Sequence, residues 1–141
     1  MHKRFTQAQH WRTEVIPRIL RPYMDILAHT NNLRDEPVAV DCNCTCLTAA
    51  SIKSIIVVRF YRLERITLET CACRPVPDQL VARGLFPCAP IDPSLAVEMR
   101  ILEFVSLLFL RVSPNNTAWC GALEEFLQKQ GYHMMGKVSY N

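Results

Sequence analysis

The chain has 141 residues, of which half are hydrophobic and 21% are charged, and its formal net charge is +3. This length suits a single small domain, and the composition excludes wholesale disorder because it supplies enough apolar side chains for a core. The longest apolar run, within 101–112, is shorter than the roughly 20 residues of a membrane-spanning helix, and the N-terminus lacks the apolar stretch of a secretory signal. We therefore expect a soluble intracellular protein without a membrane partner.

The first part of the chain is predicted to be helical. Hydrophobic residues recur at helical spacing across 10–29. Pro17 and Pro22 each lack an amide hydrogen and clash with the preceding turn, so a break or kink is expected and the helix should form in two pieces. Asn31 to Pro37 has the composition of a loop. We expect residues 1–37 to form an N-terminal helical segment that precedes a cysteine-cluster domain over 38–133.

Two strands are predicted after this segment. Ile52–Tyr61 and Ile66–Cys71 are rich in β-branched and aromatic residues, which favour strands. The residues between them, 62–65, would form the turn of a β-hairpin. The following stretch, 75–93, contains most of the prolines of the chain and is predicted to be irregular.

Two helices are predicted in the C-terminal part. Asp92 is a good N-cap and Pro93 suits the first helical position, so a helix is expected over about 94–112. This segment is apolar on nearly all sides, which predicts a buried central helix. A last helix would run from a Thr117 cap to Gln130 and end at Gly131 in a left-handed conformation. The fold class is therefore α+β, a small hairpin packed with three to four helices, followed by a frayed tail at 134–141.

Five of the seven cysteines fall into two groups on either side of the predicted hairpin, at 42–46 and 71–73. In an extended Cys-x-Cys sequence both side chains point to the same face. Two such pairs at the open end of a hairpin would supply four thiolates, the ligands that tetrahedral Zn²⁺ prefers. We predict one structural zinc ion, with Cys42 as a spare or alternative ligand. The four predicted ligands are Cys44, Cys46, Cys71 and Cys73.

Other states of the cysteines remain open. Disulfides require an oxidising compartment, which nothing in the sequence implies, and redox catalysis normally shows a Cys-x-x-Cys at a helix start. Plain reduced thiols are a further alternative, and His29 could replace one cysteine ligand. Cys88, in an apolar proline-rich context, and Cys120, beside Trp119, are predicted to be buried core residues.

Residue patterns for catalysis are absent from the sequence. The acidic residues are scattered without a spacing that predicts convergence, and there is no Gly-rich phosphate loop or nucleophile elbow. We expect a non-catalytic protein without a small-molecule substrate. Arginines on or near the hairpin are candidate phosphate contacts for DNA, although a solvated strand face has the same composition. These arginines are Arg59, Arg62, Arg65 and Arg74.

Longer segments carry a resemblance to a known family. Cys44-Thr45-Cys46, the stretches 70–75 and 79–90, and the stretch 113–120 together resemble the CxC1-like cysteine-cluster domain associated with KDZ (Kyakuja-Dileera-Zisupton) transposases of fungi. The resemblance covers roughly residues 10–133, including Trp11–Tyr23. It implies a nuclear, zinc-chelating module that engages DNA or chromatin, with the same four cysteines as ligands.

The resemblance also bears on activity and partners. Members of that family continue into a large transposase region with acidic catalytic residues, whereas this chain stops at Asn141, so no transposase activity is expected. The leading hypothesis is a DNA-binding accessory module. One alternative is a protein-interaction or oligomerisation module, which would contact a transposase or itself through apolar surface of 94–112 and the Pro-rich segment. The other is a degenerate fragment without a selected role.

Overall fold

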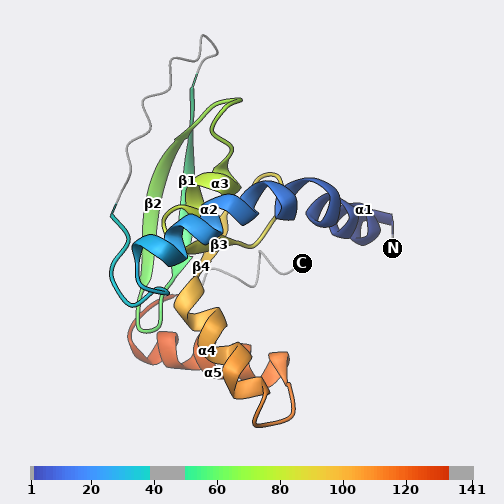
Figure 1. The fold of residues 1–141 in the computed structure, drawn as a ribbon. Coiled ribbons are helices and arrows are strands. Elements are labelled where there is room, and N and C mark those ends of the chain that lie inside the picture. Colours follow the sequence, from blue (N-terminus) through green and yellow to red (C-terminus); the bar gives the residue numbers. More distant parts are fainter. Residues whose placement is uncertain (1, 39–49, 134–141) are drawn as a thin grey trace.

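The fold is built on a four-stranded sheet, with helices beside it and at one of its ends (Figure 1). The computed structural model describes residues 2–38 and 50–133. The helices are α1 (His2–His10), a π-helical turn η1 (Trp11–Val15), α2 (Ile16–His29), α3 (Val76–Val81), α4 (Met99–Phe109) and α5 (Asn116–Lys129), and the strands are β1 (Ser51–Val58), β2 (Leu63–Thr70), β3 (Leu85–Pro87) and β4 (Leu95–Glu98). The α+β fold class is confirmed. Within the described ranges, no helix is long and apolar enough to cross a membrane.

The predicted hairpin is present as the antiparallel pair β1 and β2, in a mixed sheet of order β2-β1-β4-β3. β4 runs parallel to β1, and β3 runs antiparallel to β4. The hairpin turn lies at 59–62, where the Arg59 amide donates to the Arg62 carbonyl over 2.9 Å. It is therefore earlier than the predicted 62–65, because Leu63 already pairs with Val58 and packs in the same hydrophobic cluster.

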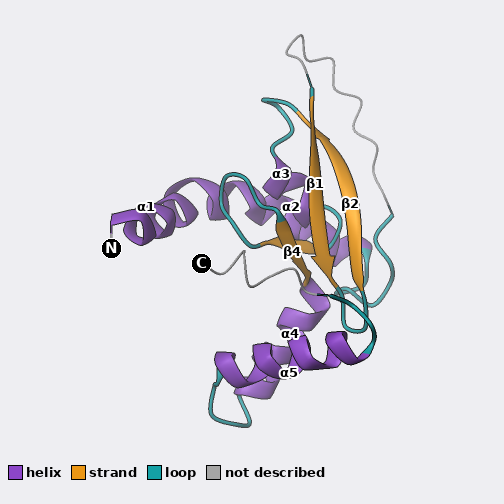
Figure 2. Cartoon of the chain, turned by 180° about the vertical axis from the view of Figure 1, so that it is seen from behind, coloured by secondary structure: helices purple, strands orange, loops and turns teal. Residues whose placement is uncertain are grey.

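The two faces of the sheet are covered by different helices. On one face, Ile55 and Leu68 pack against Val76 and Leu80 of α3. The N-terminal helices lie outside α3, where residues of α2 pack against Val81. The opposite face is covered near the hairpin turn, where a third cluster joins β1 and β4 to α4 and α5. Figures 1 and 2 both show α4 and α5 at this end of the sheet.

The N-terminal helix is continuous from α1 through η1 to α2, so the expected break at Pro17 takes the form of a widened turn. The Ile16 amide bonds to the Trp11 carbonyl, five residues back. A wider turn accommodates Pro17, which has no amide hydrogen and whose ring would clash with the carbonyl of the preceding turn. Trp11 stacks on Phe86 of β3 with ring centroids 5.7 Å apart, which anchors this turn to the sheet.

The proline-rich stretch is more regular than predicted, and the helix after it begins later. It contains α3 and β3, and residues 95–98 form β4 instead of the start of a helix. Asp92 does not cap a helix, since its carboxylate pairs with Lys53 at 3.0 Å. A buried strand and a buried helix share the same continuous apolar character, so the two cannot be separated by periodicity in this segment.

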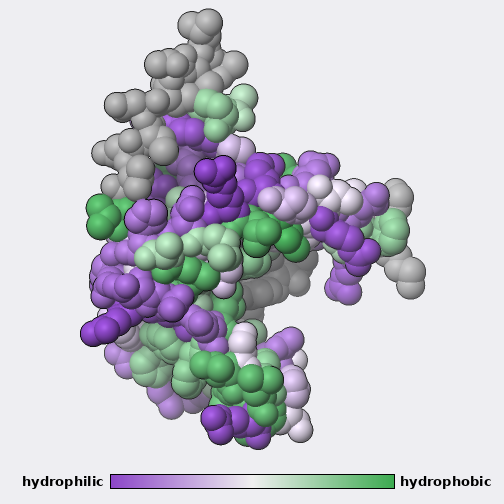
Figure 3. Space-filling view, in the orientation of Figure 1, coloured by the Kyte–Doolittle hydropathy of each residue, from purple (hydrophilic) through white to green (hydrophobic). Residues whose placement is uncertain are grey.

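The prediction that this helix is the buried centre of the domain is wrong. Met99 and Ile101 are buried at the start of α4, but Phe104 is 53% exposed and Leu107 is 57% exposed. Figure 3 shows hydrophobic surface at this end of the molecule. The last helix is confirmed, with the Asn115 side chain as its N-cap instead of Thr117 and with Gly131 at a φ of +90°. The predicted frayed tail lies outside the described residues.

Gly84 connects α3 to β3 with a φ of +73°, and a Cβ atom there would lie 3.2 Å from Cγ of Pro37. We expect Gly84→Ala to lower the free energy of unfolding by about 1–2 kcal/mol, because an L-residue is strained in this conformation. The matched control is Gly121→Ala in α5, where a Cβ atom would meet nothing within 4 Å. It should raise stability by about 0.5–1 kcal/mol. Urea denaturation measures both, and equal effects would contradict the conformation of Gly84.

Candidate metal site

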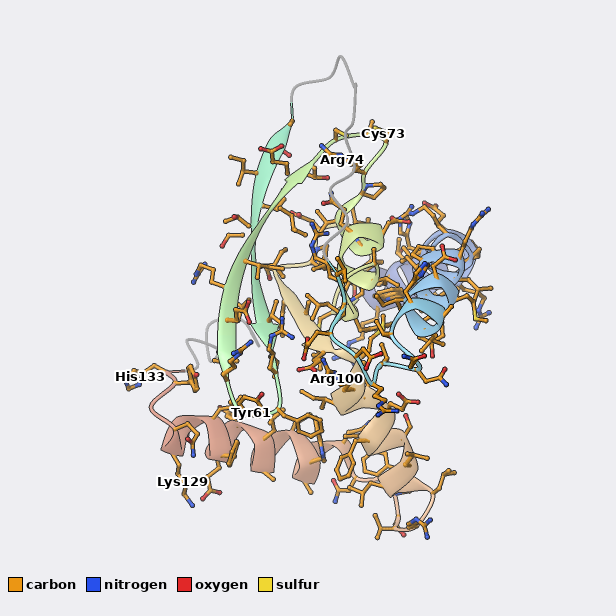
Figure 4. The ribbon with its side chains drawn as sticks, turned by 60° about the vertical axis from the view of Figure 1, so that its left-hand side comes forward. Tyr61, Cys73, Arg74, Arg100, Lys129 and His133 are labelled. Atoms are coloured by element: carbon orange, nitrogen blue, oxygen red, sulfur yellow. The ribbon has the colours of Figure 1, made fainter. Side chains whose placement is uncertain are left out.

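The open end of the hairpin carries the second cysteine pair. Thr70, the last residue of β2, pairs with Ser51, the first residue of β1, and Cys71 follows directly. Cys71 is half-buried and Cys73 is exposed. Figure 4 shows Cys73 at the tip of the connection between β2 and α3, beside Arg74. The cysteine pair therefore lies at the end of the sheet, where few apolar side chains cover the strands.

A tight turn positions the two cysteines. The Arg74 amide donates to the Cys71 carbonyl oxygen over 3.1 Å. The Arg74 carbonyl oxygen accepts from the Thr70 hydroxyl and from Nε2 of Gln79, each at 2.9 Å. Nε2 of Gln79 also donates to the Glu69 carbonyl oxygen over 2.8 Å. Because Gln79 belongs to α3, these bonds fasten the turn to a helix that is itself packed on the sheet.

The two sulfur atoms converge without an extended backbone. The prediction of an extended Cys-x-Cys is wrong for Cys71 and Cys73, because the chain reverses here to bring α3 back onto the sheet. Their Sγ atoms nevertheless lie 3.3 Å apart. This is well beyond the roughly 2.05 Å of a bond between the two sulfurs. It is near the roughly 3.8 Å that separates two sulfurs on a tetrahedral ion with Zn–S bonds of about 2.3 Å.

The described residues contain only part of the predicted site. Among residues 2–38 and 50–133, no three His, Cys, Asp or Glu side chains gather as a metal site. The predicted ligands Cys44 and Cys46, and Cys42, lie outside the described residues. The flanking residues are described: Ser51 lies beside Thr70, and the few residues from Cys46 to Ser51 can span on the order of 15 Å. Chain length therefore allows the two pairs to meet.

A cleft of about 1110 Å³ adjoins the turn, between α2 and α3. Cys73 and Val38, the last described residue before the gap, both contribute to its wall. The wall carries charges of both signs, and Nε of Arg18 pairs with the Asp78 carboxylate at 2.8 Å. His29 also lines the cleft, with Nδ1 2.7 Å from a backbone carbonyl oxygen. The wall of the cleft therefore does not concentrate charge of one sign, as a site for a highly charged ligand would.

The two remaining described cysteines are not core residues, contrary to prediction. Cys88 and Cys120 are both exposed. Cys88 follows Pro87, which is buried, so the alternation of side chains along β3 turns Cys88 away from the core. Partial desolvation by the surrounding protein still raises the pKa of the Cys88 thiol above its ordinary value. Both cysteines lie apart from the Cys71–Cys73 turn and suit a control substitution.

Two of the four candidate phosphate contacts lie at the closed end of the hairpin, already engaged with acids. Nε of Arg59 is 2.7 Å from Oε2 of Glu64, and Nη2 of Arg62 is 3.3 Å from the same oxygen. The Arg62 side chain is half exposed, whereas that of Arg59 is 22% exposed. Arg62 is therefore the better placed of the two to reach a phosphate.

The other two candidates lie elsewhere, so the four arginines do not share one surface. Arg65 is exposed on β2, where Nη1 donates to the Ser54 hydroxyl over 2.9 Å. Arg74 is half-buried at the opposite end of the hairpin, beside the cysteine turn (Figure 4). An eight-residue strand spans about 26 Å, which separates Arg74 from Arg62 by most of the length of the hairpin.

A partly buried ionic cluster was not predicted from the sequence. Glu98, at the end of β4, is buried and lies 2.8 Å from Nε of Arg100 and 3.7 Å from Nη1 of Arg59. Nη2 of Arg100 also donates to Glu36 over 2.7 Å, and this bond raises the pKa of the guanidinium. The cluster joins the hairpin turn, the start of α4 and the N-terminal segment. No local pattern could have shown it, because Arg100 and Glu36 are 64 residues apart.

Comparison with known protein families identifies most of the chain. A family model described as CxC1 like cysteine cluster associated with KDZ transposases matches residues 28–131. The match runs from the end of α2 to the end of α5 and contains both Cys-x-Cys pairs. Trp11–Tyr23, which was predicted from the sequence to belong to the same resemblance, lies outside the matched range. No curated protein and no solved structure matches the chain.

Proposed function

The chain belongs to the CxC1 like cysteine cluster family associated with KDZ transposases, and from this premise we propose that it is a non-catalytic, zinc-stabilised accessory module of a transposon-derived protein. One structural Zn²⁺ would be held by two Cys-x-Cys pairs, Cys44 with Cys46 and Cys71 with Cys73. Such an ion would tie the chain before β1 to the chain after β2. It would thereby close the hairpin at its open end.

The observation that carries this proposal is the convergence of the Cys71 and Cys73 sulfurs in a turn fixed by Gln79. Two thiolates held at this separation lose little conformational freedom on binding a metal. The open end also has little apolar cover, since Ile52 is 72% exposed. Metal ligation supplies folding free energy where a small core does not.

Metal content tests the proposal. We expect the purified 141-residue chain to contain one equivalent of zinc by elemental analysis, and Cys71→Ser/Cys73→Ser to lose it, because the two remaining thiolates cannot complete a tetrahedral site. Cys44→Ser/Cys46→Ser should lose zinc equally. Circular dichroism should show partial unfolding in both variants.

The matched control is Cys88→Ser/Cys120→Ser, which removes the same number of thiols from exposed positions. It should retain zinc and folded structure. A wild-type protein that is well folded without zinc, or a control that loses as much zinc as the ligand variants, would contradict the site.

We further propose that DNA is the partner and that the site of action is the nucleus. The support is the association of the family with transposases, enzymes that act on DNA, together with exposed arginines on one hairpin. Arg62 and Arg65 are the most accessible phosphate contacts. Arg59 would hold the turn through Glu64 and Glu98, and Arg74 would contact DNA from the cysteine end.

The salt dependence of DNA binding tests these roles. Each phosphate contact adds about 0.9 to the slope of log K against log salt concentration. We expect Arg62→Ala/Arg65→Ala to lower this slope by about 2 and to weaken binding to all sequences alike. Fluorescence anisotropy with a short duplex measures it, and Arg111→Ala, an exposed arginine beyond α4, is the control. A wild-type slope near zero, or an unchanged slope in the double variant, would contradict DNA contact by these residues.

A second candidate function is self-association through α4. Phe104 and Leu107 lie on the same side of this helix, three residues apart, and both are more than half exposed. Leu110, directly after the helix, is 82% exposed. Apolar surface gathered in this way is typical of an interaction site.

Leu107→Ser tests this candidate because it removes apolar area without touching the buried residues Met99 and Ile101. If α4 forms the interface, the wild type should sediment as a dimer and Leu107→Ser should shift it toward monomer. Sedimentation velocity measures the change, with Val112→Ser, an exposed apolar residue beyond the helix, as the control. A dimer that is unchanged by Leu107→Ser would exclude α4 as the interface.

A further inference from the structure

We propose that α1 lies in the major groove of duplex DNA, where Arg4 and Gln7 contact the edges of the bases. The proposal rests on DNA as the proposed partner and names the element that reads its sequence. α1 precedes the range 28–131 that matches the family, so this contact belongs to the N-terminal helices and not to the matched range. It does not depend on zinc.

α1 projects from the body of the protein. Figures 1 and 2 both show it extending away from the sheet, as the free end of the helix that continues through η1 into α2. Residues 3–9 are all exposed. Among the described residues, the three hydrophobic clusters include Trp11 of η1 but no residue of α1. Packing against the rest of the chain therefore does not account for the side chains of α1.

The cations of this segment are not paired with acids. The sequence before Glu14 contains Lys3, Arg4 and Arg12 but no Asp or Glu. None of the ion pairs between described residues includes these three cations. Oε2 of Glu14 itself lies 3.2 Å from Nε2 of His10. A polyanion such as DNA therefore meets unopposed positive charge along α1.

The dimensions of α1 suit the major groove. An α-helix with its side chains is about 10–12 Å across, and the major groove of B-DNA is about 12 Å wide. A helix can enter this groove only if its own protein does not cover it, and residues 3–9 meet this condition. The nine residues of α1 span about 14 Å, which equals the rise of about four base pairs.

One face of α1 carries side chains that recognise bases. Lys3 and Arg4 lie four and three residues before Gln7, so the three side chains share one face of the helix. In the major groove, Arg and Lys donate to O6 and N7 of guanine, and Gln forms two hydrogen bonds with adenine. This face therefore suits a guanine and a neighbouring adenine. Arg12, in η1, would contact a phosphate that borders the groove.

An anionic membrane is the other surface that attracts a basic helix. A helix that lies on a membrane needs a broad apolar face opposite its charges. The apolar residues of α1 are Phe5, which is 70% exposed, and Ala8. Two side chains do not make such a face, so duplex DNA is the better match.

Sequence selection and groove blocking test the proposal together. The full chain first selects its preferred duplex from a pool with a random central segment, and fluorescence anisotropy then measures the affinity. The same duplex is also prepared with a glucosylated 5-hydroxymethyl group on every cytosine, which fills the major groove and leaves the minor groove open. We expect this modification to weaken binding about tenfold or more, because it removes the base contacts. Netropsin, which fills the minor groove, should leave the affinity unchanged.

Alanine variants test the two base contacts. Arg4→Ala should remove the preference for guanine at one position, and Gln7→Ala the preference for adenine at a nearby position. Each should weaken binding to the selected duplex about tenfold. Alanine favours the helical conformation, so α1 itself is kept. Arg111→Ala, at an exposed arginine beyond α4, is the matched control and should keep both preferences.

Ala8→Pro tests whether the helix is needed and not only its charge. Proline at this position removes the amide that bonds to the Arg4 carbonyl, and its ring clashes with that carbonyl, so the residues before it should leave the helix. All cations remain, and the body should stay folded because α1 contributes nothing to the described hydrophobic clusters. We expect circular dichroism to lose the signal of this one helix and thermal melting to be unchanged. The difference in affinity between the open and the glucosylated duplex should disappear.

The contrary outcomes separate this proposal from the proposed function. A wild type that binds no DNA would overturn both. Equal binding to the open and the glucosylated duplex, with a salt slope that falls in Arg62→Ala/Arg65→Ala, would keep DNA contact by the hairpin and overturn α1 in the major groove. Unchanged preferences in Arg4→Ala and Gln7→Ala would overturn the base contacts. Tighter binding to phosphatidylserine vesicles than to DNA would assign α1 to a membrane and overturn the proposal.

Discussion

Each residue of β1 pairs with one residue of β2, from Ser51 with Thr70 at the open end to Val58 with Leu63 at the turn. This ladder fixes the position of the described candidate residues. It places Ser51, which follows the first cysteine group along the chain, beside Thr70, which directly precedes Cys71. It also places Arg59 and Arg62 at the closed end of the hairpin, about 26 Å from the second cysteine group. Because side chains alternate along each strand, one face of the sheet packs against α3 and the other packs against α5.

The charged residues of this protein form ion pairs more than they form surface patches of one sign. Glu64 and Glu98 hold Arg59 at the hairpin turn, and Glu98 also binds Arg100. The formal charge of +3 therefore does not appear as one basic surface. A buried carboxylate such as Glu98 is stable because two guanidinium groups compensate its desolvation. A DNA contact in such a molecule would depend on the few arginines that keep exposed donors.

Features governed by local chemistry could be predicted from the sequence. β-branched runs indicated the hairpin, and the left-handed Gly131 marked the end of α5. Features governed by distant partners could not. Residues 95–98 form β4 because they pair in parallel with β1. Asp92 pairs with Lys53 instead of capping a helix. Of the predicted metal site, the convergence of Cys71 and Cys73 is present, but through a turn that depends on Gln79 of a helix the sequence did not reveal.

The central claim concerns the coordination of a metal ion by four thiolates. X-ray absorption at the zinc edge of the purified protein measures this coordination directly, because sulfur and lighter ligands give different shells. We expect a single shell of four sulfur atoms at about 2.3 Å. A shell that includes nitrogen or oxygen at about 2.0 Å, or fewer than four sulfurs, would contradict ligation by Cys44, Cys46, Cys71 and Cys73.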